Sequence, residues 1–248
     1  MTKPKVFDLT GGMLLSHAHL FEIRRCLNRG GLCILPSDTC YSLSGIPMVR
    51  GIGRDIRAIL EREGQPLSVT FGIQGMAERF VQLSRAALQI IDDFTPGPVT
   101  IVVPLRIDLP NELAGALNEA LMNPKREIAI RFPDSPVELQ LSSELERPIT
   151  TTAIRYRNGD PVRSFGDAVD IVLDGISNHE IRRELHAVKL RTNQFLSGLS
   201  TVVEPRSNSD WGGVSYTIYR AGELSEGQIR KSLSALDRYI VRDINEWI

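Results

Sequence analysis

The sequence predicts an α/β fold, with a twisted mixed sheet flanked by helices around a concave ligand cleft. Apolar, β-branched runs alternate along the chain with segments whose apolar residues recur every three or four positions, and this alternation is typical of layered strands and helices. The 248 residues, 42% of them hydrophobic, suffice for one large core. Hydroxyl and carboxylate side chains follow the strand predicted at residues 32–35, at the strand end where open α/β sheets bind ligands.

Helical periodicity predicts three helices in the first hundred residues, at positions 14–29, 51–60 and 76–91. Ser16 is the expected N-cap of the first, which carries Leu20, Ile23 and Leu27 on one face. Strands are predicted where short apolar runs lie between turn residues. They cover residues 32–35, 67–71, 99–104, 128–132, 149–153, 171–173, 201–203 and 216–219.

Two segments look like additions to this core, which we place at residues 1–224. The first, at residues 177–196, is predicted to be a helix richer in Lys and Arg than in acid. It has two interpretations: a surface helix that covers the sheet, or a lid that faces anions such as RNA phosphates.

The second added segment is a helical extension at residues 225–248, which opens with the Ser-x-x-Gln pattern of a capping box. Its apolar stripe consists of Ile229, Leu233, Leu236, Ile240 and Ile244. Such a stripe is covered either by the chain's own core or by a second copy in a homodimer, and both alternatives stay open.

Composition excludes several functional classes. The chain has 29 Lys and Arg residues against 30 Asp and Glu residues, so any anion site must be local rather than a general positive surface. Three cysteines in apolar segments indicate buried thiols rather than a disulfide framework. The sequence shows no Cys/His metal spacing, nucleophile elbow or phosphate-loop motif. The absence of Cys/His spacing predicts no protein-held metal. The sequence shows no leader or membrane-spanning run either, which predicts a soluble, cytoplasmic protein with no membrane partner.

Four short motifs follow one another along the chain. Residues 36–43 read Pro-Ser-Asp-Thr-Cys-Tyr-Ser-Leu, residues 96–100 read Pro-Gly-Pro-Val-Thr, residues 131–133 read Arg-Phe-Pro, and residues 200–203 read Ser-Thr-Val-Val. Each alone has a plain structural reading: a turn, a rigid turn, a surface ion pair and a strand start. In this order and spacing the chain resembles the YrdC-like family, whose best-known members make threonylcarbamoyl-adenylate for tRNA modification. The resemblance spans residues 14–225.

The resemblance implies the family's twisted mixed sheet around a ligand cleft, and an enzyme of the nucleotidyltransferase type. Its substrates would be ATP, bicarbonate and L-threonine or a related small molecule, with Mg²⁺ on the phosphates. The implied substrate-binding residues are Ser37, Thr39, Tyr41, Thr100, Arg131 and Ser200. Arg131 would hold a carboxylate or phosphate in the fork of its guanidinium group.

The chain departs from the family at the positions expected to hold phosphate. The family's Lys-Gly-Arg-Pro becomes Glu-Gly-Gln-Pro at residues 63–66, and its Ser-x-Asn becomes Thr152, Ala153 and Ile154. A glutamate in place of a lysine beside a triphosphate replaces attraction with repulsion. A YciO-like branch of the family is similarly eroded at these motifs.

The resemblance and the remaining cations give the expected nucleotide-binding residues. These are Thr152, Arg155, Arg157 and Arg220. Arg155 and Arg157, together with Arg163, are expected to compensate for the lost cations, or else to belong to a solvated loop. Two alternatives to synthesis follow. The chain is a catalytically impaired relative that binds a nucleotide, double-stranded RNA or tRNA, or it acts on a different carbamoyl-adenylate.

Overall fold

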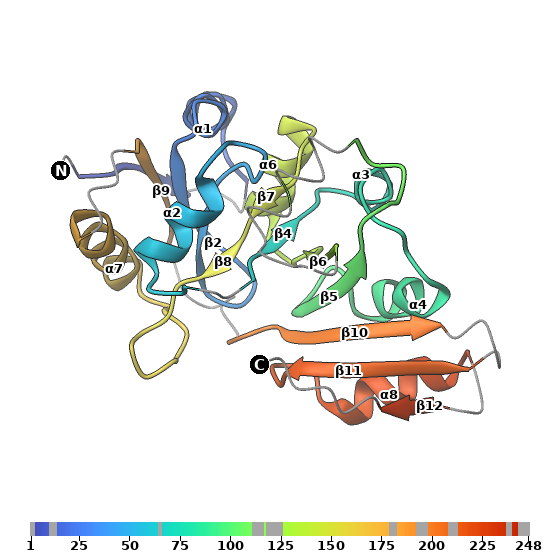
Figure 1. Cartoon of the computed structure of the whole chain (residues 1–248). Coiled ribbons are helices and arrows are strands. Elements are labelled where there is room, and N and C mark those ends of the chain that lie inside the picture. The colour runs from blue at the N-terminus through green and yellow to red at the C-terminus, as the bar shows by residue number, and fades with distance from the viewer. Residues whose placement is uncertain are drawn as a thin grey trace.

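The computed structural model describes residues 3–9, 14–63, 66–110, 117, 126–178, 183–191, 198–207, 213–236 and 240–242. Two mixed sheets, one of five strands and one of seven, form its framework (Figure 1). In spatial order the five-stranded sheet consists of β1 (Lys5–Leu9), β9 (Leu185–Leu190), β2 (Leu32–Pro36), β3 (Tyr41–Ser44) and β8 (Thr152–Ala153). The seven-stranded sheet consists of β12 (Ile240–Arg242), β11 (Val214–Arg220), β10 (Thr201–Ser207), β5 (Val99–Pro104), β6 (Glu127–Arg131), β4 (Ser68–Thr70) and β7 (Ile149–Thr150).

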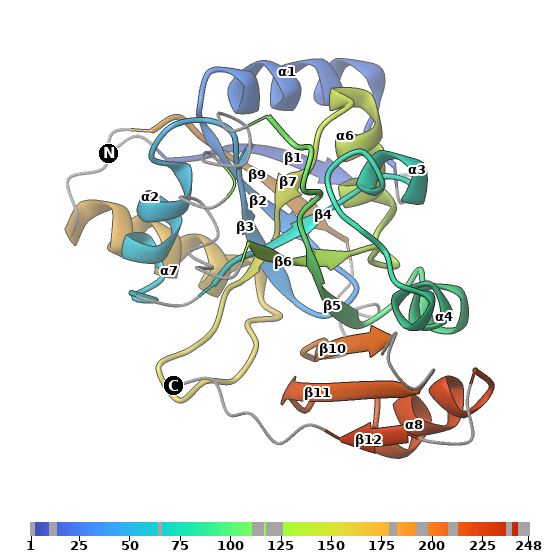
Figure 2. The same cartoon turned by 45° about the vertical axis from the view of Figure 1, so that its right-hand side comes forward.

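Helices cover both faces of the five-stranded sheet, so its central strands are buried on both sides. Alternate residues of β2 point to opposite faces, so Cys33 and Leu35 join one apolar cluster while Leu32 and Ile34 join the other. The Cys33 side packs against α1 (His17–Asn28) and α6 (Pro136–Leu145), which lie together at the top of Figure 2. The Leu32 side packs against α2 (Ile52–Ile59) and α7 (Phe165–Asn178).

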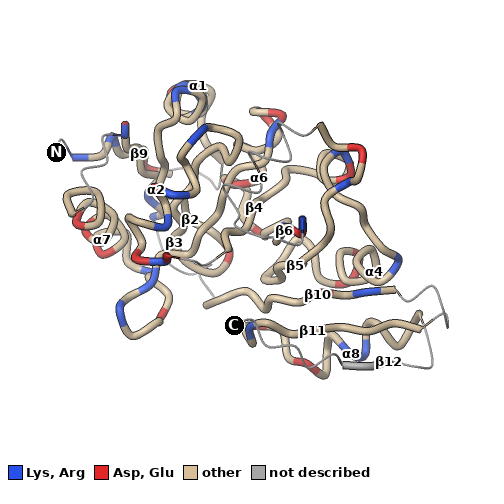
Figure 3. The backbone as a smooth tube through the Cα atoms, viewed as in Figure 1, with Lys and Arg blue, Asp and Glu red and all other residues tan. Residues whose placement is uncertain are grey.

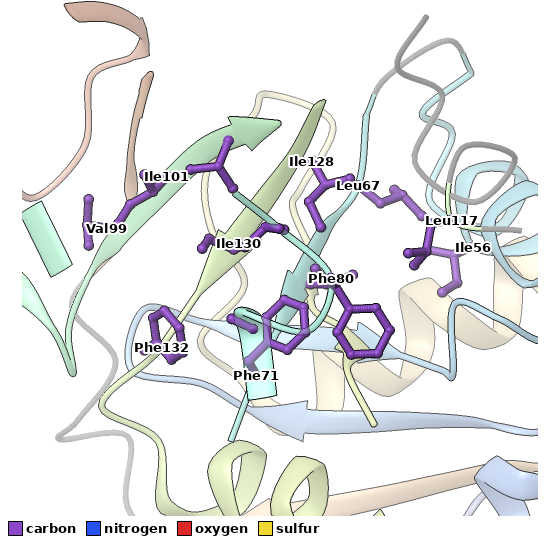
Figure 4. Packing of buried hydrophobic residues seen from close by; sticks show 14 of the residues in the cluster. Ile56, Leu67, Phe71, Phe80, Val99, Ile101, Leu117, Ile128, Ile130 and Phe132 are labelled. Carbon is purple, nitrogen blue, oxygen red and sulfur yellow. The ribbon is translucent and has the colours of Figure 1, made fainter. Parts of the chain in front are cut away.

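The seven-stranded sheet buries one face against α4 (Arg85–Phe94), which in turn contacts α8 (Glu226–Ser234). Val99, Ile101 and Val103 of β5 contribute to its core. Three phenylalanines from separate segments meet in that core (Figure 4): the ring centroids of Phe71 and Phe80 lie 5.6 Å apart, and those of Phe71 and Phe132 lie 6.4 Å apart. The alternate residues of β5, Thr100 and Val102, face the opposite side of the sheet, where the cavity described below lies.

One short segment joins the two sheets. The sequence predicted a single strand at residues 149–153, but β7 pairs with β4 in one sheet and β8 pairs with β3 in the other. Thr151 lies between them, where its N–H donates to Ser68 O at 3.0 Å and its Oγ1 lies 3.1 Å from Thr70 Oγ1. This change of sheet brings Thr152 to the wall of the cavity.

The structure confirms the helices predicted at residues 14–29 and 51–60 and most of the strands. Ser16 caps α1 through a bond from His19 N to its Oγ at 3.3 Å. The helix predicted at 76–91 is instead α3 (Gln74–Ala77) followed by α4, because Ser84 caps a new helix start and Val81 bridges to Leu105. The strand predicted at 171–173 is wrong, since these residues belong to α7.

The basic helix predicted at residues 177–196 is also wrong where the structure describes that segment. Residues Leu185–Leu190 form β9, which pairs in parallel with β1 on one side and β2 on the other. Its first four residues are buried, as a parallel strand with both faces covered requires. The lid interpretation therefore fails for the described part, and residues 179–182 and 192–197 lie outside the described residues.

The capping box at Ser225 is confirmed, and Ile229 and Leu233 are fully buried. The helix ends at Ser234, however, and Ile240 belongs to β12, which pairs with β11. Ile244 lies outside the described residues. The chain's own core therefore covers the first half of the stripe. None of the helices within the described residues has the length and apolarity that crossing a membrane requires.

Candidate functional site

A cavity of about 340 Å³ lies between the open face of the seven-stranded sheet and the edge of the five-stranded sheet. Strand alternation builds its floor from Thr100 and Val102 of β5 and from Ala129 and Arg131 of β6. The opposite wall carries Thr39, from the turn between β2 and β3, and residues of β8 and the loop that follows it. Two layers of the fold thus supply one site.

Most of the residues expected from the sequence line this cavity. They are Thr39, Thr100, Arg131 and Ser200 from the substrate-binding set, and Thr152, Arg155 and Arg220 from the nucleotide-binding set. Ser37, Tyr41 and Arg157 do not line it. Tyr41 is buried, where its hydroxyl accepts a bond from Leu190 N at 3.2 Å, and Arg157 is exposed on its loop.

The hydroxyl groups of the floor are held in a fixed arrangement. Thr100 Oγ1 lies 2.7 Å from Ser200 Oγ. Arg220 donates to the carbonyl oxygen of Ser200 through Nε at 3.1 Å and Nη2 at 2.8 Å, and to Ser200 Oγ at 2.8 Å. The turn that carries Thr39 is tied to the same region, since Gly198 N donates to Thr39 O at 2.9 Å.

Arg131 is already engaged by the protein. Its Nη2 donates to Asp38 Oδ1 at 2.7 Å and its Nη1 to Ser37 Oγ at 3.4 Å, while its buried Nε has no partner among the described residues. The resemblance implies that this guanidinium group holds a carboxylate or phosphate in its fork, and that role stays a prediction, since Asp38 and Ser37 already accept from two of its N–H groups. These two bonds use two of the five N–H donors of the guanidinium group.

Glu138, on α6, is a buried carboxyl group beneath Arg131 that sequence reasoning missed. It accepts from Ser37 Oγ at 2.9 Å and from Ser42 Oγ at 2.8 Å. Burial, reinforced by the charge of Asp38, raises the pKa of Glu138 to about 7, although Arg131 acts in the opposite direction. Burial alone would lower the pKa of Arg131, but the charges of Asp38 and Glu138 outweigh it and raise that pKa.

Arg62, which follows the end of α2, lines the cavity and was also missed by sequence reasoning. Its Nη2 donates to Ala153 O at 2.6 Å. Burial, followed by repulsion from Arg155 and Arg220, lowers the pKa of Arg62 to about 9. Glu63 is exposed and does not line the cavity, whereas Gln65 lies outside the described residues.

Arg155 and Arg220 complete a cationic side of the cavity. Burial lowers the pKa of Arg155, and burial with repulsion from Arg155 and Arg131 lowers that of Arg220 to about 10. Within the described part of the chain, no carboxylate forms an ion pair with Arg62, Arg155 or Arg220. Two buried atoms here, Arg155 Nε and Thr152 Oγ1, also have no hydrogen-bond partner among those residues.

Glu127 and Tyr219 form a different side of the cavity. Arg206 pairs with Glu127 at 3.4 Å and also with Glu204, to which the hydroxyl of Tyr219 donates. Among the described lining residues Glu127 is the only carboxylate. This donor set does not fit an Mg²⁺ ion held by the protein, since Mg²⁺ prefers carboxylate and water oxygens. The arrangement suits an anionic ligand that also offers groups for hydrogen bonds with hydroxyls.

A group of side chains whose geometry would allow them to ligate a metal ion lies elsewhere in the described chain. Among the described residues, Cys26, Glu184 and His186 place one potential ligand atom each within 4.8 Å of the others. None of the three lines the cavity.

Comparison with known proteins identifies the family to which the sequence is similar. The family model Sua5/YciO/YrdC, described as "Telomere recombination", matches residues 25–195. A putative threonylcarbamoyl-AMP synthase of Methanocaldococcus jannaschii is 30% identical over 132 residues, which are 53% of this chain and 58% of that protein. The threonylcarbamoyl-AMP synthase of Nitrosococcus oceani is 27% identical over 167 residues, 62% of this chain and 83% of that protein.

Solved structures show the same fold. Sua5 of P. abyssi, in complex with L-threonine, aligns with a TM-score of 0.66 at 18% identity and covers 96% of this chain, which spans 62% of that protein. E. coli YciO aligns with a TM-score of 0.68 at 13% identity, covering 92% of this chain and 100% of its own. At these low identities the structural similarity establishes only a common fold. The match of the sequence to the family model establishes the family. The chain belongs to the Sua5/YciO/YrdC family.

Proposed function

We propose that the chain is a nucleotidyltransferase that forms threonylcarbamoyl-AMP from ATP, bicarbonate and L-threonine and releases pyrophosphate. Family membership and the names of the relatives support this activity. So does the binding of L-threonine by P. abyssi Sua5, a protein of the same fold. We extend the proposal to a role in tRNA modification and to a cytoplasmic location, where the product would be used.

The observation that carries the proposal is the convergence of two kinds of side chain on one cavity. Hydroxyl groups of Thr39, Thr100 and Ser200 suit the polar groups of a small amino acid. Guanidinium groups that lack carboxylate partners among the described residues suit phosphates. A ligand with both features, an amino-acid carbamate next to a nucleotide, matches this combination.

The reaction needs positioning and charge neutralisation more than a protein nucleophile. The amine of L-threonine and bicarbonate form a carbamate with loss of water. A carbamate oxygen then bonds to the α-phosphorus of ATP, and the bond from that phosphorus to the bridging oxygen of the β-phosphate breaks, so pyrophosphate leaves. The arginines would offset the phosphate charge, and Mg²⁺ would enter on ATP rather than in a site of the protein.

A pyrophosphate-release assay tests the proposal. Release should require ATP, bicarbonate and L-threonine together, and omission of any one should abolish it. Thr39→Val and Ser200→Ala should lower kcat/KM for L-threonine, whereas Ser234→Ala, on the exposed side of α8, should not. Pyrophosphate release that is independent of L-threonine would contradict the proposed reaction.

A second candidate is the same chemistry on a different carbamoyl-adenylate, and the state of Arg131 favours it. Because Arg131 already forms an ion pair with Asp38 and donates to Ser37, a substrate carboxylate would have to share its guanidinium group with Asp38. Replacing L-threonine in the assay by other small amines, or by no amine at all, separates the two candidates. Pyrophosphate release that is faster with another acceptor would favour the second.

Binding of RNA without catalysis has less support. The segment at residues 177–196, predicted as a lid that could face RNA phosphates, contains the buried strand β9 where the structure describes it. Lys and Arg are interspersed with Asp and Glu along the described chain (Figure 3). We therefore place the enzymatic function ahead of a role for the chain as a partner of double-stranded RNA or tRNA.

A further inference from the structure

A positively charged side chain lines the cavity at a position that the family motif does not predict. Glu63 is exposed and residues 64–65 lie outside the described chain, whereas the preceding residue, Arg62, lines the cavity. We infer that Arg62, Arg155 and Arg220 form the polyphosphate-binding side of the cavity and that Arg62 supplies positive charge absent at residues 63 and 65. This inference rests on the proposed nucleotide site and names the residues that determine its preference for polyphosphate.

The backbone after α2 fixes the place of Arg62. Helix α2 ends at Ile59 with Leu60 as its C-cap, and Glu61 adopts a left-handed conformation with φ 52° that turns the chain back. Arg62 N then donates to Arg57 O at 2.7 Å, so the turn closes. The side chain reaches across to β8, where its Nη2 donates to Ala153 O at 2.6 Å. Arg62 is therefore held in position at the cavity before any ligand binds.

The charges at this side of the cavity are not balanced by the described protein. Arg62, Arg155 and Arg220 come from three segments, yet no described carboxylate forms an ion pair with them. Glu127, the one carboxylate among the described lining residues, is paired with Arg206. Like charges brought together in a partly dry cavity repel one another, and an anion between them removes that cost. Two buried polar atoms beside these cations, Arg155 Nε and Thr152 Oγ1, also lack hydrogen-bond partners among the described residues.

The number of cations favours a chain of phosphates over a single phosphate. Arg220 donates to Ser200 and Arg62 donates to Ala153 O, yet each keeps its full charge, and three positive charges exceed the charge of about −2 that one terminal phosphate carries. ATP and inorganic pyrophosphate carry more oxygens and more charge than AMP does. We expect the site to prefer the first two, and we expect Arg62 to contribute to that preference.

Calorimetric titration of Arg62→Gln with ATP, inorganic pyrophosphate and AMP tests the inference. A charge-assisted hydrogen bond corresponds to a loss of about tenfold or more in affinity. We expect that loss for ATP and pyrophosphate and a smaller one for AMP. Arg62→Lys, which keeps a charge and a donor to Ala153 O, should retain more affinity than Arg62→Gln. Arg230→Gln, an exposed arginine on α8, is the matched control and should bind as the wild type does.

Three results would overturn the inference: wild-type affinity of Arg62→Gln for ATP, an equal loss for AMP and ATP, or a tenfold gain in ATP affinity from Glu63→Lys. Urea denaturation of each variant shows whether it is folded. The proposed reaction is tested separately. If Arg62-dependent binding of pyrophosphate persists while L-threonine supports no turnover, the reaction is wrong and the inference stands. If turnover proceeds and Arg62→Gln binds ATP normally, the reaction stands and the inference is wrong.

Discussion

Two buried carboxyl groups share one guanidinium group next to the cavity. Asp38 and Arg131 form an ion pair at 2.7 Å with both side chains almost fully buried, and Glu138 lies beside them with its oxygens bonded to Ser37 and Ser42. Two carboxylates against one cation would leave an uncompensated buried charge. That charge is costly, so the cluster is best satisfied when Glu138 holds a proton. The raised pKa of Glu138 expresses this balance.

Glu138 should make stability fall as pH rises. Its pKa is about 7 in the folded chain against an ordinary value of 4.5, so between these values the folded state binds more protons than the unfolded state and loses stability with rising pH. The difference amounts to about 3 kcal/mol once both states are ionised. Glu138→Gln removes this dependence. The free energy of unfolding of the variant minus that of the wild type should therefore rise by about 3 kcal/mol between pH 4.5 and pH 8.

Urea denaturation at the two pH values measures this effect, with Glu144→Gln, exposed on the same helix, as the control. A difference between Glu138→Gln and the wild type that is the same at both pH values would contradict the raised pKa. The comparison uses differences between variants, so other titrating groups cancel from it.

At the scale of single residues, sequence reasoning identified side chains but not their partners. The hydroxyl residues Thr39, Thr100 and Ser200 were recognisable because each lies in a local motif at a strand end. The contact of Glu138 with Ser42, 96 positions away, leaves no local trace. Arg62 was missed because the motif comparison directed attention to the next residue, and only the turn at Glu61 shows which side chain faces inward.

At the scale of elements, β9 shows why a strand can look like a helix in a sequence. Arg183 and Arg191 flank it and Lys189 lies within it, and these cations beside apolar residues at helical spacing suggested a solvated helical face. A parallel strand owes its stability to neighbours that are distant in the chain, here β1 and β2. Local periodicity identifies α1 and α2 well because their caps and apolar faces are local, and it has no access to such pairing.

Arg183 should act as a structural residue rather than as part of an anion-binding lid. It forms an ion pair with Asp55 of α2, donates through Nη1 to Gly30 O at 2.7 Å and is largely shielded from solvent. Arg183→Gln should lower the free energy of unfolding by about 2–3 kcal/mol, because it leaves the mostly buried carboxylate of Asp55 with only the longer ion pair to the exposed Arg54 at 3.5 Å. Arg191→Gln, which is exposed, should change it by less than about 0.5 kcal/mol. A change in the salt dependence of ATP affinity for Arg183→Gln would instead support the lid.

Helix α8 should stabilise the chain through α4 without a second copy. Leu233 is fully buried, so Leu233→Ala should cost about 2–5 kcal/mol in urea denaturation. Leu236→Ala, at a partly buried position, should cost less. Light scattering of both variants should give the wild-type mass. If Leu233→Ala instead changes the mass at unchanged stability, the helix forms the interface of the predicted homodimer.

At the scale of the whole molecule, the cavity depends on how the two sheets are joined. The five-stranded sheet supplies Thr152 and, from its β2–β3 turn, Thr39, whereas the seven-stranded sheet supplies Thr100 and, just before β10, Ser200. The segment from β7 to β8 changes sheet at Thr151, so a ligand in the cavity contacts both halves of the framework at their junction. This junction cannot be read from the sequence, in which residues 149–153 look like one continuous strand.

Binding of ATP should therefore stabilise the entire fold. A ligand that binds only the folded chain adds about 2.7 kcal/mol to the free energy of unfolding at 100 times its Kd, which raises the urea midpoint at unchanged m-value. Ala129→Phe is the matched control, because it places a bulky ring on the cavity floor at a position that is not fully buried. This variant should unfold like the wild type without ATP and lose most of the shift with it. If ATP raises both midpoints equally, the nucleotide binds outside the cavity.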